Sequence, residues 1–213
     1  KVYPLLGFDN LDFMEDYRDV SYVRNYISDA SDMEHIIETY EKNKASGKPA
    51  FIFNVTMQNH GGYTDTYMNL TNDIQSQYAS EPLNQYLTLI HKTDQALENL
   101  IDYFSKVDDR TIIVFFGDHQ PNDTVASVVE NGAQAETQKR YLVPYLVWSN
   151  YGIEGAKDKN TSLNYLAAQV LTAAGVPTNA YQNYLLSLSK TYPVISAAVS
   201  YTHLRAHETL SDL

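Results

Sequence analysis

The sequence contains no cysteine. Disulfide bonds and thiolate metal sites are therefore excluded, and Asp, Glu and His are the only strong metal ligands that the chain can offer. This absence alone leaves the cellular compartment open.

Basic residues are scarce, because 15 Lys and Arg stand against 26 Asp and Glu and give a formal net charge of -11. Such a chain lacks the positive surface that nucleic acid requires, so we expect no nucleic-acid partner. An anionic membrane would repel the domain at long range. Any lipid substrate would therefore have to be captured by local contacts.

Long hydrophobic runs are missing as well, since no stretch approaches the roughly 20 apolar residues of a membrane-spanning helix. The chain begins with Lys1 rather than methionine, and we expect it to be a piece of a longer protein. Its 213 residues, 44% of them hydrophobic, suffice for one ordinary core, and we assign residues 1–198 to one domain. Residues 199–213 change composition abruptly and resemble translated sequencing-adapter read-through, so we treat them as a non-native tail.

The most informative stretch that is present is a run of β-branched and aromatic residues over 111–116, which is typical of a buried strand. Gly117 ends the run, and Asp118 and His119 follow directly. In α/β enzymes, chemistry is placed where the chain leaves the sheet in this way.

A second strand is predicted over residues 51–57, followed by a Gly-rich loop that contains His60. Residues 63–80 are polar and predict a long surface loop, and apolar residues at helical spacing then predict a helix from 81 to 104. Strand, helix and strand in this order form a βαβ unit with parallel strands. His60 would then lie at the same sheet edge as Asp118 and His119.

Two further helices and one further strand complete the prediction. A helix over about 32–44 should begin with a capping box of Ser31 and Glu34. A strand over 141–148 contains Pro144, which favours an edge position or a bulge.

The last helix should be capped by Thr161 or Ser162 and ended by Gly175 and Pro177. Residues 122–139 should form a polar loop with a helical piece. The opening segment should be an irregular packed arm.

Asp118 and His119 combine a carboxylate and an imidazole, which suit a divalent ion such as Mn²⁺, Zn²⁺ or Mg²⁺. A bare Asp-His pair is more often a turn cap beside a histidine that packs or hydrogen-bonds. The preceding strand and glycine, with the second histidine loop, favour the metal. Two ligands are still fewer than the four of a tight site.

His60 precedes two glycines, which let the backbone approach a ligand closely. It could ligate a metal or donate a hydrogen bond to an anionic oxygen, although a lone loop histidine is at least as often surface decoration. His35 and His91 should be solvated on helices, and Asp94 should be a partly buried, hydrogen-bonded carboxylate. No Ser or Thr has the strand-to-helix setting of an activated nucleophile, so we assign no catalytic residue within this chain.

Four stretches of the sequence together carry a resemblance to a known family. They are Tyr-Pro-Leu-Leu-Gly-Phe-Asp at 3–9, the segment 27–32, Thr-Met-Gln-Asn-His at 56–60 and Ile-Ile-Val-Phe-Phe-Gly-Asp-His at 112–119. Together they resemble the C-terminal half of the extracellular sulfatase-like domain of the lipoteichoic acid synthase family, the phosphoglycerol transferases of the alkaline phosphatase superfamily. The resemblance extends over about residues 1–195 in element order.

The resemblance implies a sulfatase-like α/β fold with a largely parallel sheet flanked by helices, of which this chain is a fragment. By the same resemblance, Asp118 and His119 match the ligands of one Mn²⁺-type ion, with Mg²⁺ or Zn²⁺ as alternatives, and His60 matches a histidine that contacts the glycerol phosphate group. The family's Glu ligand, its Thr nucleophile and a substrate-binding Trp and Arg pair match nothing in this chain and are expected before Lys1.

The function that the resemblance implies is transfer of glycerol phosphate from phosphatidylglycerol to a cell-envelope polymer or glycolipid. We expect a monomer attached to the cell membrane through preceding helices, with its catalytic domain facing the exterior. The chain itself should bind Mn²⁺ weakly and show no turnover. A hydrolase of sulfate or phosphate esters from the same superfamily is the first alternative, and a noncatalytic extracytoplasmic module that binds anionic glycopolymer or lipid head groups is the second.

Overall fold

The computed structural model describes residues 2–121, 125, 141–155 and 159–195. The chain divides into two compact units, the first formed by residues 1–103 with 121–131 and the second by 104–120 with 132–213. The predicted loop over 122–139, apart from Val125, and the predicted tail over 199–213 lie outside the described residues.

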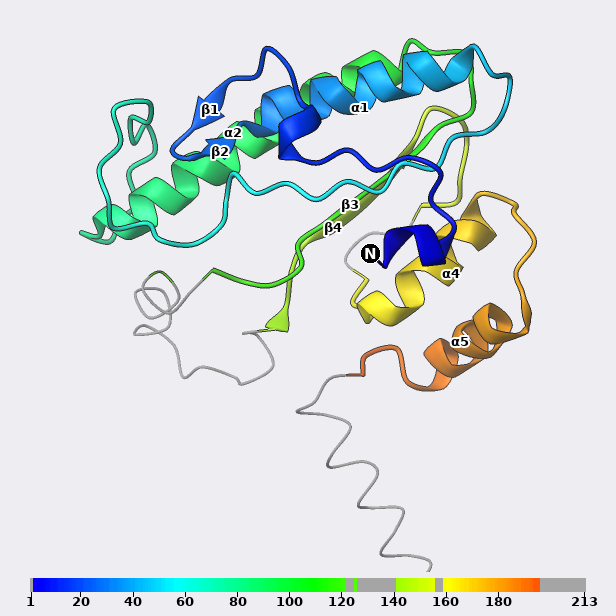
Figure 1. Ribbon diagram of the computed structural model, residues 1–213. Helices are drawn as coiled ribbons and strands as arrows, with labels where there is room; N and C mark the ends of the chain where they lie inside the picture. The colour runs from blue at the N-terminus through cyan, green and yellow to red at the C-terminus, as the bar shows by residue number, and fades with distance from the viewer. Residues whose placement is uncertain (1, 122–124, 126–140, 156–158, 196–213) are drawn as a thin grey trace, which may run out of the picture. The chain divides into compact units, whose positions relative to one another are not determined.

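Unit 1 contains two short 3₁₀ helices, a small hairpin and two long helices (Figure 1). In chain order these are η1 (Tyr3–Leu6), η2 (Met14–Asp16), β1 (Tyr22–Val23), β2 (Tyr26–Ile27), α1 (Asp29–Lys44) and α2 (Glu81–Phe104), the last of which ends at the boundary with unit 2. The two strands pair antiparallel through a two-residue turn. The opening arm is not packed as expected, because Leu5 is 87% and Leu6 67% exposed.

Helix α1 confirms the predicted helix at its C-terminal end but begins earlier than predicted. Ser28 is the N-cap, with extended backbone, and its Oγ accepts the Ser31 N–H at 3.1 Å. The expected capping box of Ser31 and Glu34 is therefore wrong, because Ser31 lies inside the first turn rather than before it. The ring of Tyr40 meets that of Tyr103, so α1 and α2 lie side by side (Figure 1).

Helix α2 follows the predicted bounds, and its N-terminal half contributes to a buried apolar cluster of unit 1. Leu83 and Leu89 cluster with Tyr63 and Val125. Asp94, expected to be partly buried, is exposed. The buried polar residue of that turn is Thr93, 5% exposed, because one residue along a helix turns the side chain by about 100°.

The expected strand over residues 51–57 does not form, because no ladder includes these residues. The segment nevertheless alternates as a strand would. Asn54, Thr56 and Gln58 are the more buried set. The residues that alternate with them, Phe51, Phe53, Val55 and Met57, are 45% to 79% exposed. A strand requires a neighbouring strand that pairs with its backbone. Among the described residues of unit 1 this segment has no such neighbour, and its inward side chains form hydrogen bonds to the helices.

Unit 2 begins with the predicted strand β3 (Ile112–Phe116), which pairs with β4 (Tyr145–Ser149). The pairing is antiparallel, with Ile112 opposite Ser149 and Phe116 opposite Tyr145, and both ladders among the described residues are of this kind. The parallel βαβ pairing of 51–57 with β3 is thus not observed in the described part of the chain. Pro144 lies just before β4, where its missing N–H costs the ladder nothing.

Two helices, α4 (Leu163–Ala173) and α5 (Ala180–Thr191), complete unit 2 and pack through Tyr165, Ala168 and Leu185. Helix α4 is the helix that was predicted as the last one. Ser162 occupies its N-cap position, but the Ser162 side chain makes no capping hydrogen bond, so the expected side-chain cap is not formed. Helix α5 was not predicted, although Asn179 and Gln182 form a capping box that signals its start.

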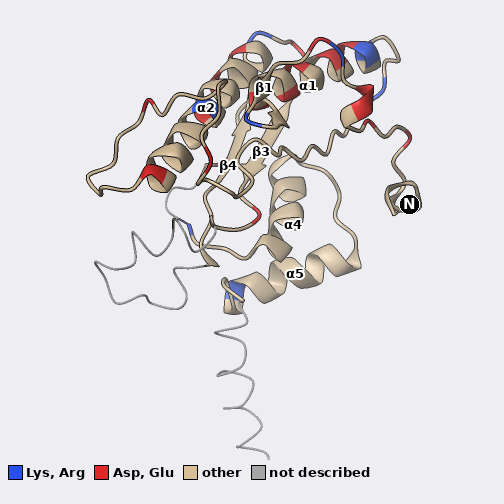
Figure 2. Ribbon diagram, turned by 60° about the vertical axis from the view of Figure 1, so that its left-hand side comes forward, with Lys and Arg blue, Asp and Glu red and all other residues tan. Residues whose placement is uncertain are grey.

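Charge is unevenly distributed between the helices. Acidic residues are spread over the helices of unit 1, whereas α4 and α5 carry a single charged residue, Lys190 (Figure 2). In the described part of the chain, no helix combines the length and hydropathy that crossing a membrane requires.

Candidate functional site

Gly117 joins β3 to the Asp118–His119 pair at a point where a Cβ would be crowded. Its N–H donates to the Pro144 carbonyl at 3.1 Å, which extends the β3–β4 ladder by one residue. A Cβ built on Gly117 would lie 3.2 Å from the Val143 Cβ, closer than ordinary contact. The glycine therefore fixes where the chain leaves the sheet and where the next two side chains project.

Asp118 and His119 present donor atoms to solvent on neighbouring residues. Oδ2 of Asp118 lies 3.6 Å from Nε2 of His119, and the two side chains are 82% and 71% exposed. Nδ1 of His119 is 2.7 Å from the Gln120 carbonyl, which assigns the proton to Nδ1 and leaves the Nε2 lone pair on the side of Asp118.

The geometry of Asp118 and His119 is compatible with both a turn cap and a pair of metal ligands. Oδ1 of Asp118 accepts the His119 N–H at 2.8 Å, as a turn-capping aspartate does. Two atoms bound to one ion at about 2.1 Å each are about 3 to 3.5 Å apart, so the 3.6 Å separation of Oδ2 and Nε2 fits chelation after a small adjustment. Asp118 and His119 thus fit part of a metal coordination shell.

The two residues do not complete such a shell. Within the described residues, no group of three or more His, Asp or Glu side chains gathers closely enough to hold an ion. The assignment of Asp118 and His119 as metal ligands remains a prediction.

His60 lies in a loop that a buried polar network fastens to both long helices of unit 1. Gln58, 1% exposed, accepts the backbone N–H of Asp29 at 3.1 Å, and its amide lies 3.4 Å from the Leu89 carbonyl. One glutamine therefore connects the start of α1, the middle of α2 and the loop. The His60 N–H closes a tight turn on the Met57 carbonyl at 3.0 Å.

Thr93 is the hub of this network on α2. Its hydroxyl donates to Oδ2 of Asp29 at 2.5 Å and accepts from the Asn59 amide at 2.7 Å. The Tyr63 hydroxyl donates to the Asn59 carbonyl at 2.7 Å. The residue before His60 is thus held by its side chain and by its backbone.

Asp29 is fully buried at the first turn of α1, and burial raises its pKa to about 6. The hydrogen bond from Thr93 opposes the shift, and the negative charge of Asp32 adds to it. Oδ1 of Asp29 has no hydrogen-bond partner. A carboxylate beside the His60 loop is therefore poorly stabilised in its charged form.

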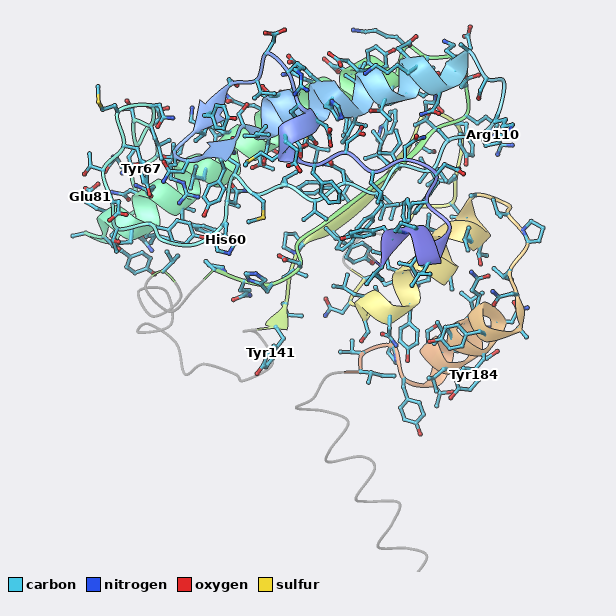
Figure 3. All side chains as sticks on the ribbon, in the orientation of Figure 1. His60, Tyr67, Glu81, Arg110, Tyr141 and Tyr184 are labelled. Atoms are coloured by element: carbon cyan, nitrogen blue, oxygen red, sulfur yellow. The ribbon has the colours of Figure 1, made fainter. Side chains whose placement is uncertain are left out.

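The His60 ring is exposed on the side of unit 1 where the hairpin lies (Figure 3). Its Nδ1 lies 3.4 Å from the Tyr26 hydroxyl, and its backbone carbonyl accepts from the Arg24 guanidinium at 2.7 Å. Tyr67, labelled with His60 in Figure 3, has its ring 5.9 Å from the same guanidinium.

Sequence reasoning identified His60 but none of the residues that support it. Arg24, Asp29, Gln58 and Thr93 are polar and all less than 6% exposed, and nothing in the local pattern of a single sequence marks a polar residue as buried. The predicted solvation is correct for His91, which is exposed. His35 instead hydrogen-bonds Asp12 at 3.0 Å and stacks on the Tyr17 ring, with centroids 4.1 Å apart.

His60 belongs to unit 1, and Asp118 and His119 belong to unit 2. The expected meeting of the three side chains at one sheet edge remains a prediction.

Comparison with known proteins adds a family and a fold. The chain is similar in structure to the Streptococcus pyogenes phosphoglycerol transferase GacH in complex with sn-glycerol-1-phosphate, with a TM-score of 0.65 and 18% identity. That match covers 94% of this chain and 53% of the other. At this identity the likeness shows the fold, and it confirms the predicted sulfatase-like α/β class.

Two curated relatives come from Rhizobium meliloti (strain 1021). One is a protein assigned to cyclic β-1,2-glucan modification, 27% identical over 208 residues, which are 91% of this chain and 32% of the relative. The other is the capsular polysaccharide biosynthesis protein RkpI, 34% identical over 126 residues, which are 57% of this chain and 21% of the relative. The chain therefore spans a third or less of either relative's length.

The family model described as Sulfatase matches residues 1–176, which include the hairpin, the His60 loop, β3 and the Asp118–His119 pair. Because the match takes in most of the chain and every candidate site residue, the protein belongs to the Sulfatase family.

Proposed function

We propose that the protein is a divalent-metal-dependent phosphoglycerol transferase, which moves glycerol phosphate from phosphatidylglycerol to a cell-envelope polymer or glycolipid. The observation that carries the proposal is the exposed pair of donor atoms, Asp118 Oδ2 and His119 Nε2, at the end of β3 in a Sulfatase-family fold. Superfamily membership supports dependence on a divalent metal, and the glycerol phosphate bound by the structural relative supports the substrate class.

Asp118, His119 and His60 would each stabilise negative charge on the phosphate group of the substrate. A divalent ion bound by Asp118 and His119 would neutralise negative charge on a phosphoryl oxygen. His60 would donate a hydrogen bond from its exposed ring to another oxygen of the same group. In the overall reaction, the phosphodiester bond to diacylglycerol is replaced by a bond to an acceptor hydroxyl, and diacylglycerol leaves with the hydroxyl proton.

Mn²⁺ binding to residues 1–213 tests the metal assignment. We expect weak binding, measured as the loss of the free-Mn²⁺ signal in electron paramagnetic resonance. Binding should be abolished in Asp118→Asn and His119→Gln. Asp94→Asn is the matched control, since Asp94 is an exposed aspartate on α2. Unchanged binding in Asp118→Asn would contradict the assignment.

The reaction itself is tested with the full-length protein and phosphatidylglycerol labelled in its head-group glycerol. Label in an envelope polymer or glycolipid supports the transferase. Label released as free glycerol phosphate supports the hydrolase alternative, which the Sulfatase family match favours as the second candidate. Absence of any turnover with Mn²⁺, Mg²⁺ or Zn²⁺ would favour a noncatalytic binding module, and ester cleavage that survives Asp118→Ala would refute the metal site.

The same proposal places the protein at the cell membrane with this domain facing the exterior. The names of the two relatives, which refer to glucan modification and capsular polysaccharide, support an envelope substrate. Protease added to whole cells should remove the domain, and its protection until the cells are lysed would argue against this location.

A further inference from the structure

Arg24 occupies an unfavourable position in the hairpin turn. It is the first of the two turn residues between Val23 and Tyr26, and its φ of 56° lies in the left-handed region that favours glycine. Its side chain is only 4% exposed. A residue with a Cβ and a long charged side chain is thus held in strained backbone and withdrawn from water.

The partners of the Arg24 guanidinium are carbonyl oxygens and aromatic rings. One nitrogen, Nη2, donates to the carbonyls of Gln58 at 2.5 Å and His60 at 2.7 Å. The rings of Tyr26, Tyr63 and Tyr67 have centroids 5.3, 5.6 and 5.9 Å from its central carbon. Among the described residues no carboxylate pairs with it, and its buried Nε has no hydrogen-bond partner.

A buried charge without a counter-ion and a strained backbone both cost folding free energy, so a contribution to stability does not explain why Arg24 stands at this position. Both of its strong hydrogen bonds go to the loop that presents His60, and its turn is itself held by Asn69, whose amide donates to the carbonyls of Tyr22 and Arg24 at 3.0 Å each. The strained backbone and the buried charge therefore both belong to the residue whose hydrogen bonds fix the His60 backbone.

Tyr26, on the next strand of the same hairpin, contacts the ring rather than the backbone of His60. Its hydroxyl is 3.4 Å from Nδ1, and the ring centroids are 6.0 Å apart. If the hydroxyl donates to Nδ1, the imidazole carries its proton on Nε2.

We propose that Arg24 and Tyr26 are positioning residues for His60, which fix the backbone and the ring so that Nε2–H is presented as a donor to an anionic oxygen. This inference rests on the proposed role of His60 as the contact to a glycerol phosphate group. It adds that the hairpin sets the geometry of that contact.

The experiment uses residues 1–213 and two measurements. Exchange of the His60 amide proton reports how firmly its turn on Met57 is held, and titration with glycerol phosphate, followed at the His60 ring ¹H–¹⁵N signals, reports affinity. Arg24→Gly should speed amide exchange and weaken binding, each about tenfold or more, because the hydrogen bonds from a charged donor are lost. Glycine also suits the positive φ, so this variant keeps the turn.

Tyr26→Phe should shift the His60 ring signals and weaken binding by a smaller factor while leaving amide exchange unchanged. Arg24→Lys should restore only part of the affinity lost in Arg24→Gly, because an ammonium group does not reproduce the planar fork of donors. The controls are Asp19→Gly, which relieves a similar positive φ of 53° away from His60, and Tyr67→Phe, which removes a hydroxyl from another ring facing Arg24. Both should behave as the wild type.

Unchanged amide exchange and unchanged affinity in Arg24→Gly would overturn the role of Arg24, and an unchanged His60 ring spectrum in Tyr26→Phe would overturn that of Tyr26. Failure of the proposed function has a different signature, since His60→Gln would then bind glycerol phosphate as well as the wild type, or the wild type would not bind it. The amide-exchange and ring-signal comparisons decide the positioning roles in either case.

Discussion

Replacing Asp29 with asparagine removes the carboxylate that lies buried between α1, the His60 loop and Thr93. Asp29 is 0% exposed, and its pKa is raised from 3.8 to about 6 by burial, with the Thr93 hydrogen bond opposing and the Asp32 charge reinforcing the shift. The folded chain therefore binds this proton more tightly than the unfolded chain does.

The magnitude follows from the two pKa values. At 1.36 kcal/mol for each pH unit, a rise from 3.8 to about 6 corresponds to about 3 kcal/mol of folding free energy. This contribution is present below about pH 4, is lost as pH rises through about 6, and stays constant above that. Asp29→Asn carries no ionisable group at this position, so the free energy of unfolding of the variant should not decrease in this way as the pH rises.

Urea denaturation of the wild type and Asp29→Asn at several pH values between 4 and 7 measures the difference. The wild type should lose roughly 2 kcal/mol more than the variant across this range, because part of the total of about 3 kcal/mol is already lost at pH 4. Asp94→Asn is the control. Because Asp94 is exposed, this variant should show the same pH dependence of stability as the wild type. Equal pH dependence in Asp29→Asn and the wild type would refute the argument.

The absolute stability of Asp29→Asn at pH 7 is a poorer test. The new amide nitrogen would take the place of either carboxylate oxygen, and Oδ1 has no hydrogen-bond partner. A buried donor left unsatisfied costs about 1 to 3 kcal/mol, which offsets the gain from removing the charge. The pH dependence isolates the ionisation because this cost is the same at every pH.

Three further substitutions test the packing and capping that position the candidate site. Gly117→Ala should lower stability by about 1 kcal/mol or more, because its Cβ would meet Val143 at 3.2 Å, and adding Val143→Ala should recover most of the loss in a double-mutant cycle. Asn150→Ala should lower the unfolding free energy by about 1 to 3 kcal/mol, since its amide donates to carbonyls at the end of α2 and in the turn before β3, and an unchanged thermal midpoint would contradict this. Ser28→Ala should cost about 1 kcal/mol and speed exchange of the Ser31 amide, and an unaltered exchange rate there would show that the cap is not formed in solution.

Elements with strong local signals were correctly predicted from the sequence. The apolar period of α2, the β-branched run of β3 and the polar stretch at 63–80 each depend on neighbours in the chain, and their bounds agree closely with the structure. The Gly-Asp-His sequence after β3 likewise identified the place where the chain leaves the ladder. Helix α5 had an equally local signal, in the capping box of Asn179 and Gln182, which was overlooked.

Strand pairing could not be predicted in the same way. Residues 51–57 have the composition of a strand and alternate in burial as one, yet no described ladder includes them, and β3 pairs antiparallel with β4 rather than parallel with this segment. Strand partners are separated by many residues, so their pairing depends on which distant segments meet.

By itself, the sequence determined which donor types are available: the absence of cysteine restricts the metal donors, and the carboxylate and imidazole of Asp118 and His119 follow a strand and a glycine. Only the tertiary structure decided which polar residues leave water. Arg24, Asp29, Gln58 and Thr93 come from a hairpin, two helices and a loop, and they converge on the segment that carries His60. Their burial is a property of the packed unit, since each polar group can be withdrawn from water only where another element supplies its partner.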